Sequence, residues 1–121
     1  IGAAAAEVLQ AAYDTADVFV LPSRYEGYGM VFAEAMAHGL PVVCADIDAA
    51  REVVPEVAGL RAPPNDAAAL AALLRALLGD QNRRAAIAQA AHAHAAAQPG
   101  WDATARIIRD ALAPLAGRAA A

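Results

Sequence analysis

The sequence predicts an α/β fold in which a parallel sheet is followed by C-terminal helices. Two short apolar runs are typical of buried strands. The first, 16–22, ends at Pro22, and the second, 41–45, ends before Asp46. A helical pattern over 30–38 lies between them. Because a strand, a helix and a strand in this order cross over right-handedly, the two strands are expected to be parallel.

The endings of helices and strands place the other elements of the first half. A helix over about 3–13 precedes the first strand, and Gly39 ends the helix between the two strands. One helical turn over 50–54 is expected to end at Pro55, and 59–62 is short enough to be an edge strand. Parallel sheets normally have more than two or three strands, covered on both faces. We therefore expect the C-terminal half of a larger, Rossmann-like domain.

The second half of the chain predicts three helices. Asn65 or Asp66 caps the first, and Asp80 opens a second that runs to about residue 97. The third is expected from Trp101 to about Leu115. The leucines of the first of these helices recur at helical spacing and form one apolar stripe: Leu70, Leu73, Leu74, Leu77 and Leu78.

We expect residues 1–117 to be the C-terminal portion of that larger domain and residues 118–121 to be a disordered tail. An incomplete parallel sheet leaves edges and apolar faces uncovered, and such surfaces promote self-association. We therefore expect a homodimer of this chain, in which two copies complete each other's sheet or exchange their C-terminal helices. The helix after Trp101 is the element most ready to move, because Pro99 and Gly100 form a hinge before it.

The composition excludes some classes of function. The 121 residues carry a net charge of −4, and all nine cations are arginine, a bias typical of a GC-rich bacterial genome. They form no basic cluster, which argues against binding to nucleic acid or to a membrane surface. Although 60% of the residues are hydrophobic, 38 are alanines, which bury little area. The single cysteine, Cys44, is expected to be a small core residue.

The loop between the first strand and the following helix is the candidate ligand site. It follows the carboxyl end of a strand, where open α/β sheets bind ligands. Gly27 and Gly29 lack Cβ atoms, so a ligand can approach their backbone closely. The N–H groups near Gly29, Met30 and Val31 open the helix without helical partners and can attract a phosphate.

Two carboxylates flank this anion site. Glu26 lies in the loop, and Glu34 lies about five residues into the helix, roughly 7 Å along its axis. Ionised carboxylates only accept hydrogen bonds, so each suits a vicinal diol. The residues alone leave an alternative open, in which Glu26 is a solvated loop residue and Glu34 an ordinary helix former.

A longer pattern surrounds these two residues. Residues 16–23, followed by Glu26-Gly-Tyr-Gly-Met and Glu34-Ala-Met-Ala-His-Gly-Leu-Pro-Val-Val, strongly resemble the retaining group-1, family-4-type glycosyltransferases of the GT-B fold. The donor-site signature of that family is a glutamate, seven residues and a second glutamate, which Glu26 and Glu34 match. The segment 59–64 resembles a later turn of the family, and the resemblance covers about residues 8–115.

The resemblance implies that this chain is the nucleotide-sugar-binding part of an enzyme that transfers a hexose to a hydroxyl acceptor. Glu26 would position the transferred sugar, and Glu34 would bind the ribose. The amides of Met30 and Val31 would face the diphosphate. The implied catalytic residue is thus Glu26, the implied substrate-binding residues are Gly27, Tyr28, Gly29, Met30, Val31 and Glu34, and no metal is required.

The resemblance also implies parts that cannot be matched in this chain. The donor, of UDP or GDP type, would also contact an Arg and Lys pair earlier in the family's sequence, and the acceptor would bind an N-terminal domain. Where the family often has Gly-Gly, this chain has 47–50, Ile-Asp-Ala-Ala, although Glu52 aligns with a frequent family glutamate. We therefore expect the isolated chain to be inactive.

The alternative hypothesis for the function is a non-catalytic fragment or interaction module that keeps the donor pocket. The expected location is cytoplasmic, with a membrane-peripheral full-length parent as an alternative.

Overall fold

The computed structural model describes residues 5–119, which form a three-stranded parallel sheet and six helices. The sheet has the order β1-β2-β3. In chain order the elements are α1 (Ala6–Thr15), β1 (Phe19–Leu21), α2 (Met30–Ala37), β2 (Val42–Ala45), α3 (Asp48–Val53), β3 (Gly59–Ala62), α4 (Ala67–Leu78), α5 (Gln81–Ala97) and α6 (Trp101–Ala119). The predicted α/β class, with a parallel sheet before C-terminal helices, is confirmed.

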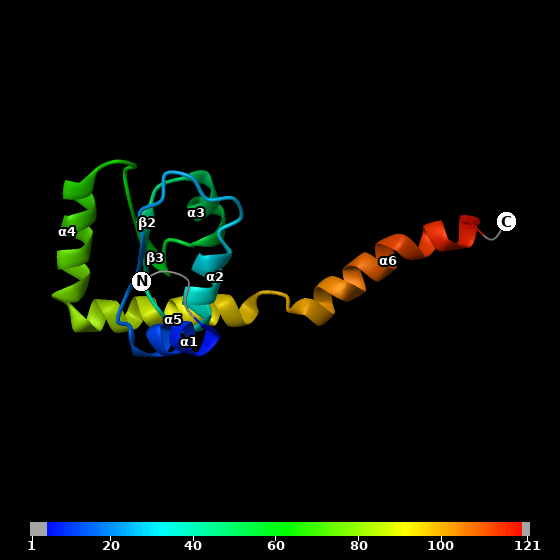
Figure 1. Ribbon diagram of the computed structural model, residues 1–121, viewed down its shortest axis with the longest axis horizontal. Coiled ribbons are helices and arrows are strands. Elements are labelled where there is room, and N and C mark those ends of the chain that lie inside the picture. Colours follow the sequence, from blue (N-terminus) through cyan, green and yellow to red (C-terminus); the bar gives the residue numbers. More distant parts are fainter. Residues whose placement is uncertain (1–4, 120–121) are drawn as a thin grey trace.

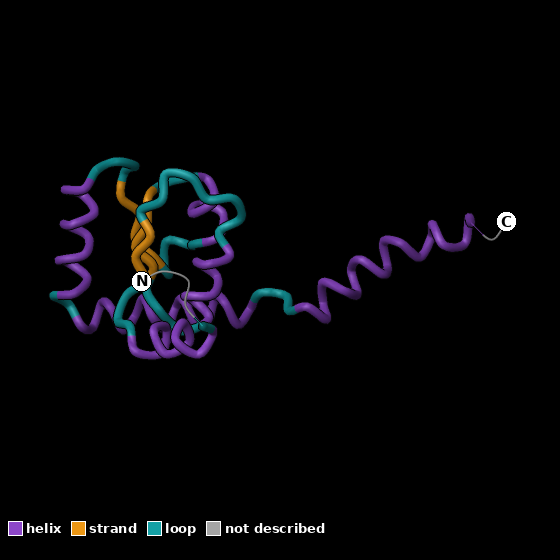
Figure 2. Tube along the Cα trace, in the orientation of Figure 1, coloured by secondary structure: helices purple, strands orange, loops and turns teal. Residues whose placement is uncertain are grey.

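The sheet lies between two layers of helices (Figure 1). Helices α2 and α3 cover one face, and α4 covers the other, where it packs on β2 and β3. Helix α5 runs across one end of the sheet and joins the two layers by packing on both α2 and α4. Helix α6 leads away from the other elements, as the tube in Figure 2 also shows.

The central strand β2 holds the core together. Its four residues are all buried, and Val42 and Cys44 face the cluster that includes Phe32 and Met36 of α2. Burial raises the pKa of the Cys44 thiol to about 11. The thiol is therefore protonated near neutral pH, and the expectation that Cys44 is a core residue is confirmed.

The loops and caps follow the predicted chemistry. Gly39 adopts a left-handed φ of 69° after α2, and the N–H of Leu40 donates to the carbonyl of Ala35 at 3.0 Å. Asp66 caps α4 by accepting from the N–H of Ala69 at 2.8 Å, and Asp80 caps α5 in the same way. Of the two candidate caps, Asp66 is therefore the cap.

Some element bounds differ from the prediction. Strand β1 covers only 19–21 of the expected 16–22, because only these residues pair with β2, in the register Phe19↔Val42 to Leu21↔Cys44. The helical turn expected at 50–54 begins earlier, at Asp48, and ends at Val53.

The two ends of the chain also differ in their bounds. Helix α1 starts at Ala6; the first two residues of the expected 3–13 helix lie outside the described residues. Helix α6 reaches Ala119, within the tail expected over 118–121, and residues 120 and 121 are not described.

Two surfaces of the described chain carry uncovered apolar residues. Because α4 packs on β2 and β3, Val20 of the edge strand β1 is 39% exposed. Along α6, five residues alternate at spacings of four and three, the pattern of a helix that packs against another helix. They are Trp101, Ala105, Ile108, Leu112 and Leu115, and the four large side chains are each more than half exposed.

None of the helices within residues 5–119 has the length and apolar character that crossing a bilayer requires.

Candidate functional site

The loop from Pro22 to Gly29 joins the carboxyl end of β1 to the first turn of α2. Gly29 is the N-cap of α2 and has a left-handed φ of 73°. A Cβ atom there would lie 3.1 Å from the Phe32 ring and 3.2 Å from a methyl of Val53. Both the backbone angle and the available space therefore require glycine at this position.

The first turn of α2 presents free backbone donors. The carbonyl of Gly29 accepts hydrogen bonds from the N–H groups of Phe32 and Ala33, so the hydrogen bonding of the helix begins at Gly29. The N–H groups of Met30 and Val31 come before Phe32, the first residue whose N–H donates within the helix, so they have no partner within the helix. The positive end of the helix dipole reinforces them.

A cavity of about 370 Å³ lies against this turn and brings several predicted site residues together. Tyr28, Gly29, Met30 and Glu34 line it, with Ala33 and Val53 completing its wall. We call this the Glu34 cavity. It joins a carboxylate to the N-terminal end of α2, which is the combination that the sequence predicts for a ligand with both a diol and an anion.

The other predicted site residues lie outside the Glu34 cavity. Gly27 lines an adjoining cavity of about 500 Å³ together with Tyr28 and Glu52. Val31 is half-buried and packs against the core, so it contributes to the site through its backbone. Glu26 is half-buried and lines neither of these two cavities. Its assigned role at the sugar stays a prediction.

The structure brings Tyr13 to the site, a residue for which the sequence predicts no role. Tyr13 of α1 donates a hydrogen bond from its hydroxyl to Oε2 of Glu34, at 3.2 Å. Burial, the Glu34 charge and this hydrogen bond raise the pKa of Tyr13. The contact is tertiary, and no local spacing in the sequence signals it.

Asp46, directly after β2, anchors the helix that supplies Val53. Its carboxylate accepts from Nε and Nη2 of Arg51 at 2.9 and 3.0 Å, and Nε of Arg61 lies 3.4 Å away. The hydrogen bond from Arg51 and the charges of both arginines hold the pKa of Asp46 below its usual range. The carboxylate stays ionised and fixes α3 beside the Glu34 cavity.

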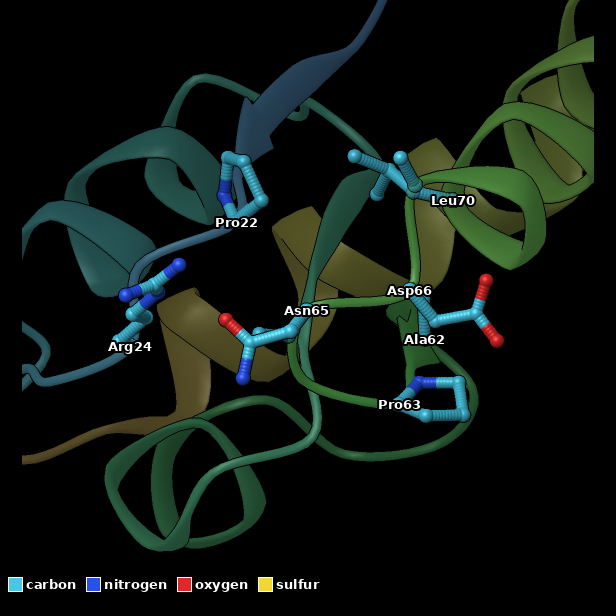
Figure 3. Close-up of a pocket in the computed structure, with 9 residues that line it drawn as sticks. Pro22, Arg24, Ala62, Pro63, Asn65, Asp66 and Leu70 are labelled. Atoms are coloured by element: carbon cyan, nitrogen blue, oxygen red, sulfur yellow. The ribbon is translucent and has the colours of Figure 1, made fainter.

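A separate cavity of about 260 Å³ lies at the carboxyl ends of all three strands (Figure 3). Pro22, Ala45 and Ala62 each come from the end of one strand, and Leu70 comes from α4. Arg24 is the only cation among the residues that line this cavity. In Figure 3 the Asp66 carboxylate points away from the cavity. Asp66 is already engaged in capping α4, so this cavity offers less chemistry than the Glu34 cavity.

Within residues 5–119 no three His, Cys, Asp or Glu side chains converge closely enough to hold a metal ion.

Comparison with known proteins assigns the chain to a family. The family described as glycosyl transferases group 1 matches residues 1–94, more than three quarters of the chain. The chain belongs to the group 1 glycosyltransferases.

Relatives of this group 1 glycosyltransferase chain carry transferase names. D-inositol 3-phosphate glycosyltransferase of Xylanimonas cellulosilytica is 43% identical over 102 residues, which are 84% of this chain and 24% of that protein. O-antigen chain mannosyltransferase B of Escherichia coli is 46% identical over 78 residues, 64% of this chain and 20% of that protein. This chain therefore spans about a quarter or less of these curated relatives.

A solved structure supports the fold of the group 1 glycosyltransferase chain. Sucrose-phosphate synthase from Thermosynechococcus elongatus superimposes with a TM-score of 0.85 at 33% identity. The match covers 98% of this chain and 30% of that protein. The GT-B resemblance predicted from the sequence is confirmed.

Proposed function

We propose that this chain is the donor-binding part of a longer, retaining hexosyltransferase. The observation that carries the proposal is the Glu34 cavity, which places a carboxylate beside the amide end of α2. A nucleotide sugar has the matching chemistry, a ribose diol next to a diphosphate. In this assignment Glu34 binds the ribose and the Met30 and Val31 amides face the diphosphate. Family membership and the transferase names of the relatives support it.

In the proposed reaction the bond between the hexose C1 and the diphosphate oxygen breaks. A hydroxyl oxygen of the acceptor forms the new bond to C1 and passes its proton to the leaving diphosphate oxygen, and the configuration at C1 is retained. The leaving diphosphate is stabilised by preorganised helix-end amides, without a metal in our proposal. Glu26 positions the sugar, assisted by the backbone of Gly27 to Met30.

The donor is of the UDP or GDP type, and the acceptor binds a part of the enzyme outside this chain. We place the longer enzyme in the cytoplasm, with a membrane-peripheral location as the alternative. The second candidate function is a non-catalytic fragment or interaction module that keeps the donor pocket. The small fraction of each relative that the chain spans favours this candidate for the isolated chain.

The isolated chain is expected to bind nucleoside diphosphates weakly and to transfer no sugar. The two methionines are natural probes, because Met30 is 67% exposed in the Glu34 cavity and Met36 is 1% exposed in the core. Adding UDP or GDP to the chain with ¹³C-methyl methionine should shift the Met30 signal and leave the Met36 signal in place. Sugar transfer should be undetectable, because the Arg and Lys contacts to the diphosphate that the family resemblance implies cannot be matched in this chain. Each such contact is worth about a hundredfold in rate.

The control for this experiment is Glu34→Ala, which should reduce the Met30 shift at equal nucleotide concentration. If neither nucleotide shifts the Met30 methyl signal at millimolar concentration, donor binding would be contradicted. Sugar transfer by the purified chain at an ordinary enzymatic rate would contradict its expected inactivity.

We also propose that the isolated chain dimerises through α6. Its apolar residues repeat at alternating spacings of four and three from Trp101 to Leu115, which suits pairing with a second amphipathic helix. A second copy of the chain supplies such a helix, and residues 98–100 provide the hinge.

Light scattering at high micromolar concentration should give the mass of a dimer. Ile108→Asp should return the chain to a monomer, while Arg106→Ala should not. A monomeric parent chain would refute the proposal.

A further inference from the structure

Tyr13 makes the one hydrogen bond that fixes the Glu34 carboxylate within the described part of the chain. Its hydroxyl donates to Oε2, and no described group donates to Oε1. A carboxylate can accept about four hydrogen bonds, so Oε1 and the remaining lone pairs of Oε2 stay available to a ligand. Glu34 is itself exposed, and a free glutamate side chain on a helix surface samples several rotamers.

The Tyr13 ring is held rigidly in turn. It is 8% exposed, although it lies on the otherwise exposed helix α1. On one side it stacks on the His38 ring with a centroid distance of 4.8 Å and an angle of 9°, and it also stacks on Phe19 at 6.1 Å. Nδ1 of His38 is hydrogen-bonded to Oδ1 of Asp14 at 3.1 Å, which fixes the His38 ring against Tyr13. The hydroxyl is therefore presented to Glu34 in one place.

We infer that Tyr13 is a positioning residue that holds Glu34 in the rotamer that receives the two ribose hydroxyls of the donor. This inference rests on the proposed function, because it assigns the ribose to Glu34. The hydrogen bond removes the entropy cost of ordering the carboxylate when the donor binds. The effect of Tyr13 is thus specific to donors that carry the diol.

The test compares UDP with 2′,3′-dideoxy-UDP, which lacks both ribose hydroxyls. The Met30 methyl signal reports binding to this chain, and the variant Tyr13→Phe removes only the hydroxyl. A hydrogen bond to a charged group is worth at least about tenfold in an equilibrium constant, and the variant loses only the part of it that orders the carboxylate, so we expect UDP to bind about three- to tenfold more weakly to the variant. The affinity for dideoxy-UDP should not change. A merely structural role would weaken both ligands alike.

Two further variants complete the experiment. Thr15→Val is the matched control, because it removes a different hydroxyl of α1, one that is exposed and donates only to the carbonyl of Ala11, at 2.7 Å; it should leave both affinities unchanged. Glu34→Ala should abolish the preference for UDP, and adding Tyr13→Phe to it should have no further effect. The Tm and the Met36 signal confirm that each variant is folded.

The outcomes separate the two hypotheses. If Glu34→Ala removes the preference for UDP but Tyr13→Phe leaves it intact, the inference about Tyr13 is wrong and the proposed function stands. If Glu34→Ala leaves the preference intact, the ribose assignment fails, and the inference about Tyr13 fails with it. Equal losses for UDP and dideoxy-UDP in Tyr13→Phe would also overturn the inference.

Discussion

Glu26→Ala is expected to lower kcat of the proposed full-length transferase by about a hundredfold, with a smaller change in the KM for the donor. The reason is that Glu26 is assigned to the transferred sugar, where a misplaced reacting group is costly. Glu34→Ala is expected to raise the donor KM about tenfold and to leave kcat nearly unchanged, because the ribose is remote from the bond that breaks. Steady-state kinetics with varied donor concentration separates the two effects.

Glu7→Ala provides the matched control, because Glu7 is exposed on α1 and lines no described cavity. Both kinetic constants should be those of the parent enzyme. Because Glu26 lies outside the Glu34 cavity, this experiment is also the direct test of its role. Parental kcat in Glu26→Ala would show that the glutamate is only a solvated loop residue.

Gly59→Ala is expected to destabilise the chain by about 3 kcal/mol or more and to leave it largely unfolded. A Cβ atom at this position would lie 2.5 Å from a methyl of Val54 and 2.7 Å from the carbonyl oxygen of Val42. The carbonyl belongs to the central strand, where Val42 pairs with Gly59 itself, so it cannot move without breaking the β2–β3 pairing. Urea unfolding followed by circular dichroism measures the loss.

The control for the Gly59 prediction is Gly100→Ala. A Cβ atom there meets no atom within 4 Å, and the glycine lies between α5 and α6. Its free energy of unfolding should stay within about 0.5 kcal/mol of the parent value. A Gly59→Ala variant as stable as Gly100→Ala would mean that β3 can shift away from β2.

The helices could be predicted because their signals are local. The leucine spacing shows the helical period of α4, the aspartate caps fix where α4 and α5 begin, and Gly39 fixes where α2 ends. The length of β1 could not be predicted in the same way. An apolar run shows that a strand is buried, but pairing partners decide where it ends, and β1 has partners only from Phe19 to Leu21.

The candidate site was predictable on its loop side only. Gly29 and the start of α2 follow from glycine and helix-end chemistry, and the structure places them beside Glu34 as expected. Tyr13 and Val53 reach the same place from α1 and α3. They come there through the packing of separate helices around the sheet, which no spacing within 13–53 specifies.

The strand order β1-β2-β3, which is the order of the sequence, has a consequence for how the protein is made. Phe19 and its partner Val42 are 23 residues apart, and Val42 and Gly59 are 17 apart. Each strand can therefore join the growing sheet soon after it leaves the ribosome, and no strand must insert between two earlier ones. Synthesis thus extends the sheet in one direction, away from β1. In the proposed full-length transferase, the outer edge of β1 would meet strands that were translated earlier.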